Sequence, residues 1–275
     1  MTANQISDTE PEDEYVQFSC TVNYLETFLD SVDAFRDEGE LVFTSDTIYT
    51  KVNDPANVGM CVSKIEGQAL NSLELQNTDQ LNAGLRFDNI LDCISSVGGS
   101  NDIEVTWPVS SGGTRMIRLD IIDEDMQFEL NTLNTGTVPN MPQAEPLSHK
   151  SQVEVGGSKL KKTIQHAQNV ISKDNTGITI ETFGETLQIS STEKTSGQFR
   201  KQFHNNDPSV DADLGEHKTS ISVDYLDDIK NIFGKGDVVT VHVKQDNPVR
   251  FDIDLDDAGD AQVIYIIAPR LEADS

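Results

Sequence analysis

The sequence is poor in positive charge. Its 275 residues include 20 lysine and arginine residues against 47 aspartate and glutamate residues, which gives a formal net charge of −27 at pH 7. Such a charge exceeds what solubility in dilute buffer requires. Mutual repulsion of carboxylates is tolerable where salt screens it, over roughly 3 Å at about 1 M ionic strength. The composition therefore favours a protein adapted to high salt, and the alternative is an acidic protein from an ordinary cytoplasm.

Cysteine and long apolar runs are also scarce. Cys20, Cys61 and Cys93 are odd in number and widely separated, which excludes both a disulfide framework and a CxxC metal half-site. We expect reduced, mostly buried thiols. The N-terminus lacks a charged segment followed by an apolar one, and no stretch is long enough to span a bilayer. We therefore expect a soluble protein located in the cytoplasm.

Motifs of catalysis and of base-specific DNA reading are absent. The sequence has no GxSxG elbow, no GxxxxGK[ST] loop, no HExxH, no zinc finger and no basic zipper. Acidic pairs such as Asp227-Asp228 are expected as surface charge in a chain with 47 acidic residues. Gly112-Gly113 is expected to form a turn between strands, since no helix follows it. The sequence thus predicts no enzyme, no metal site and no cofactor.

What is present is a two-part organisation. Residues 1–14 are polar and acidic and are expected to form a mobile tail. Residues 134–150 contain three prolines and a glycine without periodicity, as expected of an interdomain connector. This division leaves residues 15–133 and 151–275 as two domains.

The two domains carry the same helical spacing of apolar residues, 135 positions apart. The matching positions are Leu25, Leu29 and Val32 with Leu160, Ile164 and Ala167, and Leu91, Ile94 and Val97 with Leu226, Ile229 and Ile232. These patterns predict helices at about 22–36, 86–97, 157–172 and 223–233, separated by strands. Strand patterns include 41–53, 102–109, 115–122 and 126–133. The expected fold class is a duplicated α+β domain.

Three segments resemble one protein family. They are Val52–Met60 (VNDPANVGM), Asp246–Arg250 (DNPVR) and Tyr265–Arg270 (YIIAPR). In this order and at this separation they resemble the DNA sliding clamps of the proliferating cell nuclear antigen (PCNA) family. With the acidic composition, the sequence is identified as a clamp of haloarchaeal or haloarchaeal-virus type.

The resemblance implies a subunit of two duplicated clamp domains, with outer antiparallel sheets and inner helices, that assembles as a homotrimeric ring. Such a ring encircles duplex DNA without reading its sequence and serves as a polymerase processivity factor in DNA replication and DNA repair. It implies docking peptides from DNA polymerase, clamp loader, ligase and nuclease as partners, and no catalysis.

The resemblance also places a partner-peptide pocket beneath the connector and beside the C-terminal segment. The residues at those positions are Asn53, Val58, Val138, Met141, Pro248, Ile266, Ile267, Ala268 and Pro269. Ordinary core or connector packing is the alternative for each apolar member.

Positive charge is concentrated in the second half of the chain. Residues 1–133 hold 25 acidic and 6 basic residues, whereas residues 134–275 hold 22 and 14. Lysines near a helix N-terminus oppose the helix dipole, so the lysines of the third predicted helix need another reason, such as DNA phosphates. The predicted DNA-facing residues are Lys159, Lys161, Lys162, His166, Lys173, Lys230 and Arg86. A solvated basic face is the alternative.

The first two predicted helices depart from the basic inner surface that the resemblance implies. They carry Glu26, Asp30, Asp33, Asp88 and Asp92, relieved by Arg36 and Arg86. Either hydrated cations bridge these carboxylates to phosphates, or DNA contact depends on the second domain alone. We favour the first explanation.

Ring closure is expected to come from edge strands, which the resemblance places at 126–133 in the first domain and at about 196–203 in the second. The residues predicted at this subunit interface are Phe128, Glu129, Leu130, Phe199, Arg200 and Lys201. A solvated edge is the alternative reading. An acidic interaction or regulatory subunit that does not encircle DNA by itself remains the second functional hypothesis, and a carboxylate-rich metal enzyme is the third.

Overall fold

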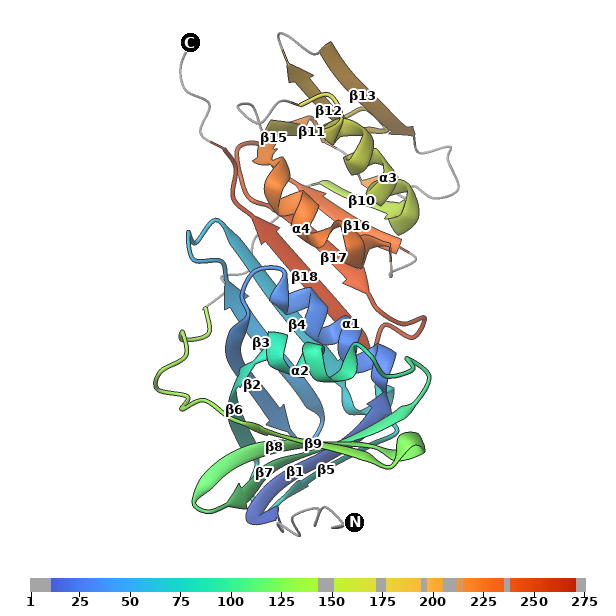
Figure 1. Ribbon diagram of the computed structural model, residues 1–275. Coiled ribbons are helices and arrows are strands. Elements are labelled where there is room, and N and C mark those ends of the chain that lie inside the picture. The colour runs from blue at the N-terminus through green and yellow to red at the C-terminus, as the bar shows by residue number, and fades with distance from the viewer. Residues whose placement is uncertain are drawn as a thin grey trace. The chain divides into compact units, whose positions relative to one another are not determined.

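The computed structural model describes residues 11–142, 151–171, 177–193, 197–204, 212–213, 215–234 and 238–270. The chain forms two compact units. Unit 1 contains residues 1–33, 37–50 and 64–140, and unit 2 contains residues 34–36, 51–63 and 141–275. In each unit two helices pack together against antiparallel strands (Figure 1).

Unit 1 begins with β1 and ends beyond β9. Its elements are β1 (Pro11–Thr21), α1 (Val22–Asp33), β2 (Glu38–Thr44), β3 (Thr47–Asn53), β4 (Gly59–Glu66), β5 (Ser72–Gln76), β6 (Gln80–Arg86), α2 (Phe87–Ile94), β7 (Asp102–Ser111), β8 (Thr114–Ile121) and β9 (Met126–Asn131), with short 3₁₀ helices at Gly67–Ala69 and Ile122–Glu124. One sheet has the order β5-β1-β7-β8-β9, and β3, β2 and β6 lie side by side in another. The end of β3 and the start of β4 belong to unit 2.

Unit 2 repeats this plan. Its elements are β10 (Ser151–Gly156), α3 (Gly157–Gln168), β11 (Gly177–Phe183), β12 (Thr186–Glu193), β13 (Gly197–His204), β14 (Ala212–Asp213), β15 (His217–Ser222), α4 (Val223–Phe233), β16 (Val238–Val243), β17 (Val249–Asp254) and β18 (Ala261–Ile267). One sheet has the order β13-β12-β11-β15, and a second contains β14-β10-β16-β17-β18.

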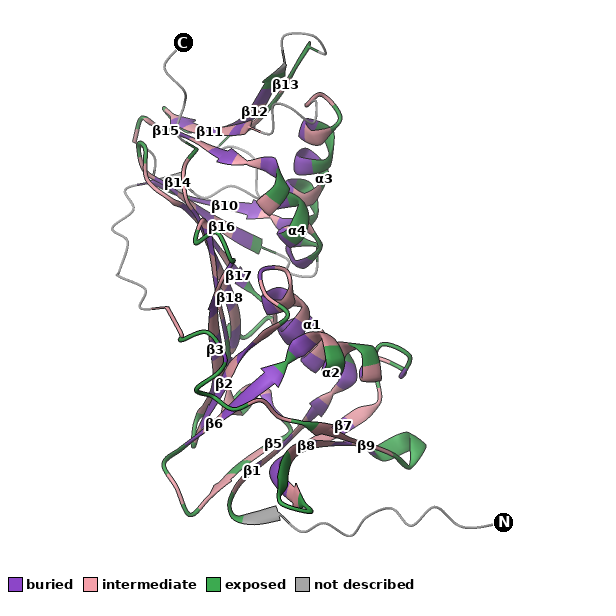
Figure 2. Ribbon diagram, turned by 60° about the vertical axis from the view of Figure 1, so that its left-hand side comes forward, coloured by how far each residue is buried: buried purple, intermediate pink, exposed green. Residues whose placement is uncertain are grey.

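The repeated apolar positions form the helix faces that pack on the strands, except Val97, because α2 ends at Ile94 and not at the predicted 97. All twelve are buried except Leu91, which is half-buried. Figure 2 shows these buried faces turned toward the strands of the same unit, with half-buried or exposed positions on the opposite side of each helix. Apolar burial at this spacing drives such helices into place, because their isolated stability in water is marginal.

The strands of unit 2 alternate as half-buried strands should. In β18 the side chains of Tyr265 and Ile267 are fully buried, and Phe251 pairs across from Tyr265. Ile264 and Ile266 lie on the other face of the same strand and are partly exposed. The sheet therefore has one core face, covered by helices, and one outer face.

Several expected boundaries were wrong. The first strand starts at Pro11 and not at Tyr15, since pairing with β7 reaches Pro11 and the side-chain amide of Asn77 donates to the carbonyl of Asp13 at 2.6 Å. The predicted tail therefore ends earlier, and residues 1–10 lie outside the described residues. The helices α1 and α3 end at Asp33 and Gln168, before the predicted 36 and 172.

The expected strand 41–53 is a hairpin. The hydroxyl of Thr44 accepts the backbone N–H of Thr47 at 3.0 Å, which forms the turn between β2 and β3. The predicted turn at Gly112-Gly113 is confirmed, with φ of 59° and 83° at the two glycines. Cys20 and Cys61 are buried, Cys93 is half-buried, and none forms a disulfide. Across the described ranges, every helix is too short or too polar to cross a membrane.

Candidate functional site

The segment between β3 and β4 is organised by one carboxylate. Asp54 is buried, and its Oδ1 accepts the backbone N–H groups of Val58 at 2.7 Å and Gly59 at 2.6 Å. Its Oδ2 accepts the N–H of Ala56 at 2.8 Å. Short polar side chains form such local turns readily. The Asp54 loop, residues 54–59, is therefore held in one conformation from within.

A tyrosine from α4 completes this arrangement. The hydroxyl of Tyr225 donates to Oδ2 of Asp54 at 2.9 Å. The ring of Tyr225 packs edge-on against Phe35, whose centroid lies 5.9 Å away. A Cβ at Gly59 would lie 3.0 Å from the Phe35 ring and 3.2 Å from the Tyr225 ring, so the loop can approach the aromatic pair only through glycine.

The pKa of Asp54 records these contacts. Burial raises it, but the hydrogen bonds from Gly59, Ala56, Tyr225 and Val58 lower it more, so the pKa lies below its ordinary value. Burial, followed by the hydrogen bond to Asp54, raises the pKa of Tyr225 to about 12. The pair is thus an ionised acceptor and a protonated donor across the neutral range.

The loop is joined to the segment after β18. The backbone N–H of Ala268 donates to the carbonyl of Val58 at 2.8 Å, and Nε of Arg36 donates to the carbonyl of Asn53 at 3.0 Å. Val58, Ile266, Ala268 and Pro269 are all partly exposed, as is Pro248 before β17. The structure thus brings the start of the motif Val52–Met60 next to the motif Tyr265–Arg270.

Two other residues of the predicted pocket, Ile267 and Val138, are buried. Ile267 has no exposed surface and faces the core, so its side chain cannot meet a ligand without unfolding. Val138 is buried in unit 1, and the partly exposed Met141 is assigned to unit 2.

The predicted DNA-facing lysines lie on α3 and α4, which pack against each other. Lys159 and Lys162 are exposed near the N-terminus of α3. Nζ of Lys161 donates to Oδ1 of Asn231 at 3.0 Å, which connects α3 to α4. Lys230 pairs with Asp227, whose carboxylate also accepts the amide of Gln168. Lys161 and Lys230 are therefore half-buried and held by polar partners on α4, whereas the side chains of Lys159 and Lys162 are exposed.

The other predicted DNA-facing residues are less well placed. Arg86 precedes α2, where its guanidinium pairs with Asp88 at 2.7 Å and Asp37 at 3.4 Å. Two carboxylates neutralise it, which weakens it as a phosphate contact. His166 is exposed on α3 and stacks on Phe199, with ring centroids 6.2 Å apart. Lys173 lies outside the described residues.

The acidic residues of α1 and α2 act on one another. Burial raises the pKa of Asp33, and the negative charges of Asp88, Asp37, Asp30 and Asp92 raise it further. Oδ1 of Asp33 is buried without a hydrogen-bond partner among the described residues. The neighbouring carboxylates thus repel ionised Asp33, and salt screens this repulsion.

We predict that Asp33→Asn stabilises the protein at neutral pH, by up to about 1 kcal/mol at low salt. Because the pKa of Asp33 is raised in the folded state, its ionisation destabilises the fold. This destabilisation is absent below the ordinary carboxyl pKa range and appears as the pH rises. The gain should therefore vanish at low pH and shrink in concentrated potassium chloride. Thermal unfolding at several pH values and salt concentrations measures it. Glu26→Gln, on the same helix, is the control for lowered net charge, and an equal gain from it would contradict the prediction.

The predicted interface residues lie on edge strands. β9 ends the five-stranded sheet and carries Phe128, Glu129 and Leu130, all partly exposed. Glu129 accepts Nη2 of Arg118 from β8 at 3.0 Å. β13 ends the four-stranded sheet and carries Phe199, Arg200 and Lys201, of which the two cations are exposed. Among the described residues, each strand thus has one side without a strand partner in its own sheet.

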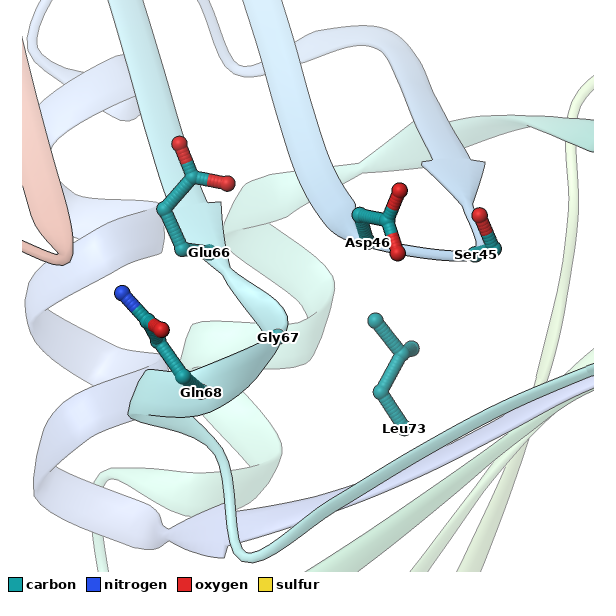
Figure 3. A pocket seen from close by; sticks show the side chains of 6 residues that line it. All are labelled: Ser45, Asp46, Glu66, Gly67, Gln68 and Leu73. Atoms are coloured by element: carbon teal, nitrogen blue, oxygen red, sulfur yellow. The ribbon is translucent and has the colours of Figure 1, made fainter.

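Unit 1 also has a cavity that sequence reasoning did not anticipate. It measures about 460 Å³ and is lined by Ser45, Asp46, Glu66, Gly67, Gln68 and Leu73 (Figure 3). Glu66 pairs with Lys64 at 2.5 Å, and the backbone N–H of Gly67 donates to the carbonyl of Asp46 at 2.6 Å. This polar cavity contains none of the predicted site residues.

Sequence reasoning missed Asp54 and Tyr225 as a pair. The motif Val52–Met60 carries the family resemblance, but the role of its carboxylate depends on a donor that lies 171 positions away on α4. An Asp followed by Pro and by Asn, which often forms turns, is the local signal of a buried cap.

The chain is similar along nearly its whole length to archaeal proteins, although no family model matches it. It is 25% identical over 265 residues to the DNA polymerase sliding clamp of Methanocella arvoryzae, covering 94% of this chain and 100% of that protein. It is 23% identical over 246 residues to the DNA polymerase sliding clamp of Natronomonas pharaonis, covering 90% and 94%.

Among solved structures, the chain resembles the PCNA of Archaeoglobus fulgidus bound to the C-terminal region of FEN-1. The TM-score is 0.83 with 20% identity, covering 94% of this chain and 100% of that one. The predicted clamp-type α+β fold is therefore confirmed. The chain is thus similar along nearly its whole length to archaeal DNA polymerase sliding clamps, and it shares the fold of PCNA.

Proposed function

We propose that three copies of this chain close into a ring around duplex DNA and tether a DNA polymerase to its template. The observation that carries the proposal is the duplicated unit, in which paired helices cover one face of the strands and an edge strand is left at β9 in one unit and β13 in the other. Two different edge strands on one chain allow a head-to-tail contact, and such contacts can close into rings. Function then comes from binding and topology and not from catalysis.

The proposed joint between subunits has complementary chemistry. Arg200 and Lys201 on β13 would meet the acidic surroundings of β9, where Asp123, Glu124 and Asp125 precede the strand. Exposed ion pairs contribute little in concentrated salt. Backbone hydrogen bonds and the side chains of Phe128, Leu130 and Phe199 would then supply most of the association.

The proposed docking groove consists of Val58, Pro248, Ile266, Ala268 and Pro269. These residues are partly exposed and lie on segments that the Asp54 loop joins through the Val58–Ala268 hydrogen bond. The clamp of A. fulgidus, which has a similar fold, binds the C-terminal region of FEN-1. By analogy, we propose that peptides from polymerase, nuclease, ligase and clamp loader dock here.

The surface charge supports a high-salt source, cellular or viral. A net charge of −27 would repel neighbouring subunits in dilute buffer, and salt would screen that repulsion. The relative from N. pharaonis is one of several archaeal relatives, so the haloarchaeal assignment depends on charge and remains part of the proposal.

The deciding experiment is the mass in solution, measured by light scattering during size exclusion at about 3 M and about 0.1 M potassium chloride. We expect three times 30.3 kDa in high salt and dissociation in low salt. A monomer under both conditions would remove the encircling mechanism. The protein would then be an acidic interaction subunit, a role that the carboxylates of α1 and α2 also suit.

A further inference from the structure

A second cavity opens in unit 2, beside the proposed docking groove. It has a volume of about 350 Å³ and is lined by Lys218–Ser220 at the start of β15, by Gln245 and Asp246 in the turn between β16 and β17, and by Pro269 and Arg270 after β18. None of these residues except Pro269 belongs to the site positions considered above. We call it the basic pocket.

Hydrogen bonds between the segments that line the basic pocket hold it in shape before any ligand binds. The backbone N–H of Lys218 donates to Oε1 of Gln245 at 3.0 Å, and the N–H of Asp246 donates to the carbonyl of Lys218 at 3.3 Å. The N–H of Arg270 donates to the carbonyl of Ser220 at 2.7 Å. Each of the other two segments is thus connected to β15, so the pocket requires little rearrangement to accept a ligand.

The charge of the pocket is opposite to that of the chain. Two of its residues are cationic, Lys218 and Arg270, and one is acidic, Asp246. The carboxylate of Asp246 already accepts the side-chain amide of Gln245 at 2.8 Å. In a protein with 47 acidic and 20 basic residues, this local excess of cations favours an anionic ligand.

A glycine leaves room for the arginine. A Cβ at Gly177 would lie 2.9 Å from Nη1 of Arg270 and 3.4 Å from the hydroxyl of Ser220. The guanidinium therefore lies against the backbone of β11 and close to the Ser220 hydroxyl. Ammonium, guanidinium and hydroxyl groups together form a set of donors suited to a carboxylate.

We propose that the basic pocket binds the side-chain carboxylate of an acidic residue that flanks the docking peptide of a partner. This inference rests on the proposed docking function. The occupant follows from continuity, because Pro269 belongs to both sites and Ala268 of the groove precedes it directly. The volume suits one or two side chains and not a separate peptide. The pocket would thereby favour partners whose docking motif has an acidic neighbour.

The test uses fluorescent synthetic peptides of the A. fulgidus FEN-1 C-terminal region, extended at either end by Gly-Ser-Gly or by Gly-Glu-Gly. Binding to the intact protein is measured by anisotropy at about 0.5 M and about 3 M potassium chloride. At the lower salt we expect the glutamate extension at one end to tighten binding about fivefold over the serine extension. Lys218→Glu and Arg270→Gln should each remove this advantage and leave the serine peptide unchanged. Lys244→Glu, outside the pocket, is the matched control.

The outcomes separate this inference from the proposed function. If the serine peptides bind and Ile266→Asp abolishes their binding, the docking groove stands. If the glutamate peptides then show no advantage at either end, the basic pocket is overturned alone. The same holds if Lys218→Glu weakens both peptides equally, or if inorganic phosphate binds at Lys218 while glutamate adds nothing. If no peptide binds at any salt concentration, both proposals fail.

Discussion

Replacing Asp54 with alanine is expected to lower the free energy of unfolding by about 3 kcal/mol. The substitution removes the acceptor of three backbone N–H groups and of the Tyr225 hydroxyl. An unsatisfied buried donor costs about 1–3 kcal/mol, and some of these donors would regain water when the loop opens. Denaturant unfolding in concentrated salt measures the change.

Two further substitutions separate the contribution of the Tyr225 hydrogen bond from that of the backbone hydrogen bonds to Asp54. Tyr225→Phe removes one hydrogen bond and should cost about 1 kcal/mol. Asp54→Asn retains one acceptor oxygen, so its cost should fall between those of the other two variants. A double-mutant cycle of Asp54→Asn with Tyr225→Phe should show coupling, since both remove the same contact. Asp46→Ala, an exposed aspartate in another turn, is the control. Unchanged stability in Asp54→Ala would show that the loop is held by other contacts.

The pH dependence of this pair has a definite sign. The folded pKa of Asp54 lies below its ordinary value, so the stabilisation is present above the ordinary carboxyl range and is lost as the pH falls through the folded pKa. The difference in stability between the parent and Asp54→Asn should therefore narrow on acidification. Asp33, whose pKa is raised, should show the opposite trend.

The loss of Asp54 should also reduce peptide docking. The carbonyl of Val58 receives the N–H of Ala268, and Val58 itself is placed by its own N–H bond to Asp54. A disordered loop would have to be ordered again at each binding event, which lowers affinity without removing any contact residue. Asp54→Ala should thus weaken the serine-extended peptide more than Tyr225→Phe does.

The sequence predicted the duplicated fold because helical spacing is a local signal. Leu160, Ile164 and Ala167 are spaced for one face of a helix, and burial of that face follows from the pattern itself. Element ends were less predictable, because tertiary contacts decide them. Phe35 has a helical neighbourhood in sequence, but its ring contacts Tyr225 and Tyr265, and α1 ends two residues before it.

The site was predictable only in part, for a similar reason. Lys161 looked equivalent to Lys162 in sequence, yet Asn231 of α4 engages it, and that partner comes from packing of α3 on α4. Ile267 shared a motif with Ile266, but strand alternation places the two on opposite faces. The motif resemblance identified the segment Tyr265–Arg270 as part of the site. The direction of each side chain could be assigned only once the segment was placed in its sheet.

The second large effect is expected from the double variant Lys159→Glu/Lys162→Glu. We predict that the proposed ring, with both substitutions, binds duplex DNA on the order of tenfold more weakly at about 0.3 M salt. Each lost phosphate contact should also reduce the slope of log affinity against log salt by about 0.9. Anisotropy of a labelled duplex across a salt series measures both quantities. The control is Lys64→Glu/Lys244→Glu, which changes the net charge equally at other positions.

Folding and binding respond to this variant in opposite directions, which makes the result decisive. Lys159 and Lys162 lie near the N-terminus of α3, where positive charge opposes the helix dipole and glutamate favours it. The variant should therefore be at least as stable as the parent and keep its ring mass, so a loss of DNA binding cannot come from unfolding. Equal DNA binding by both double variants would show that Lys159 and Lys162 do not contact DNA. The encircling ring would then hold DNA by topology and by cations bound between phosphates and the carboxylates of α1 and α2.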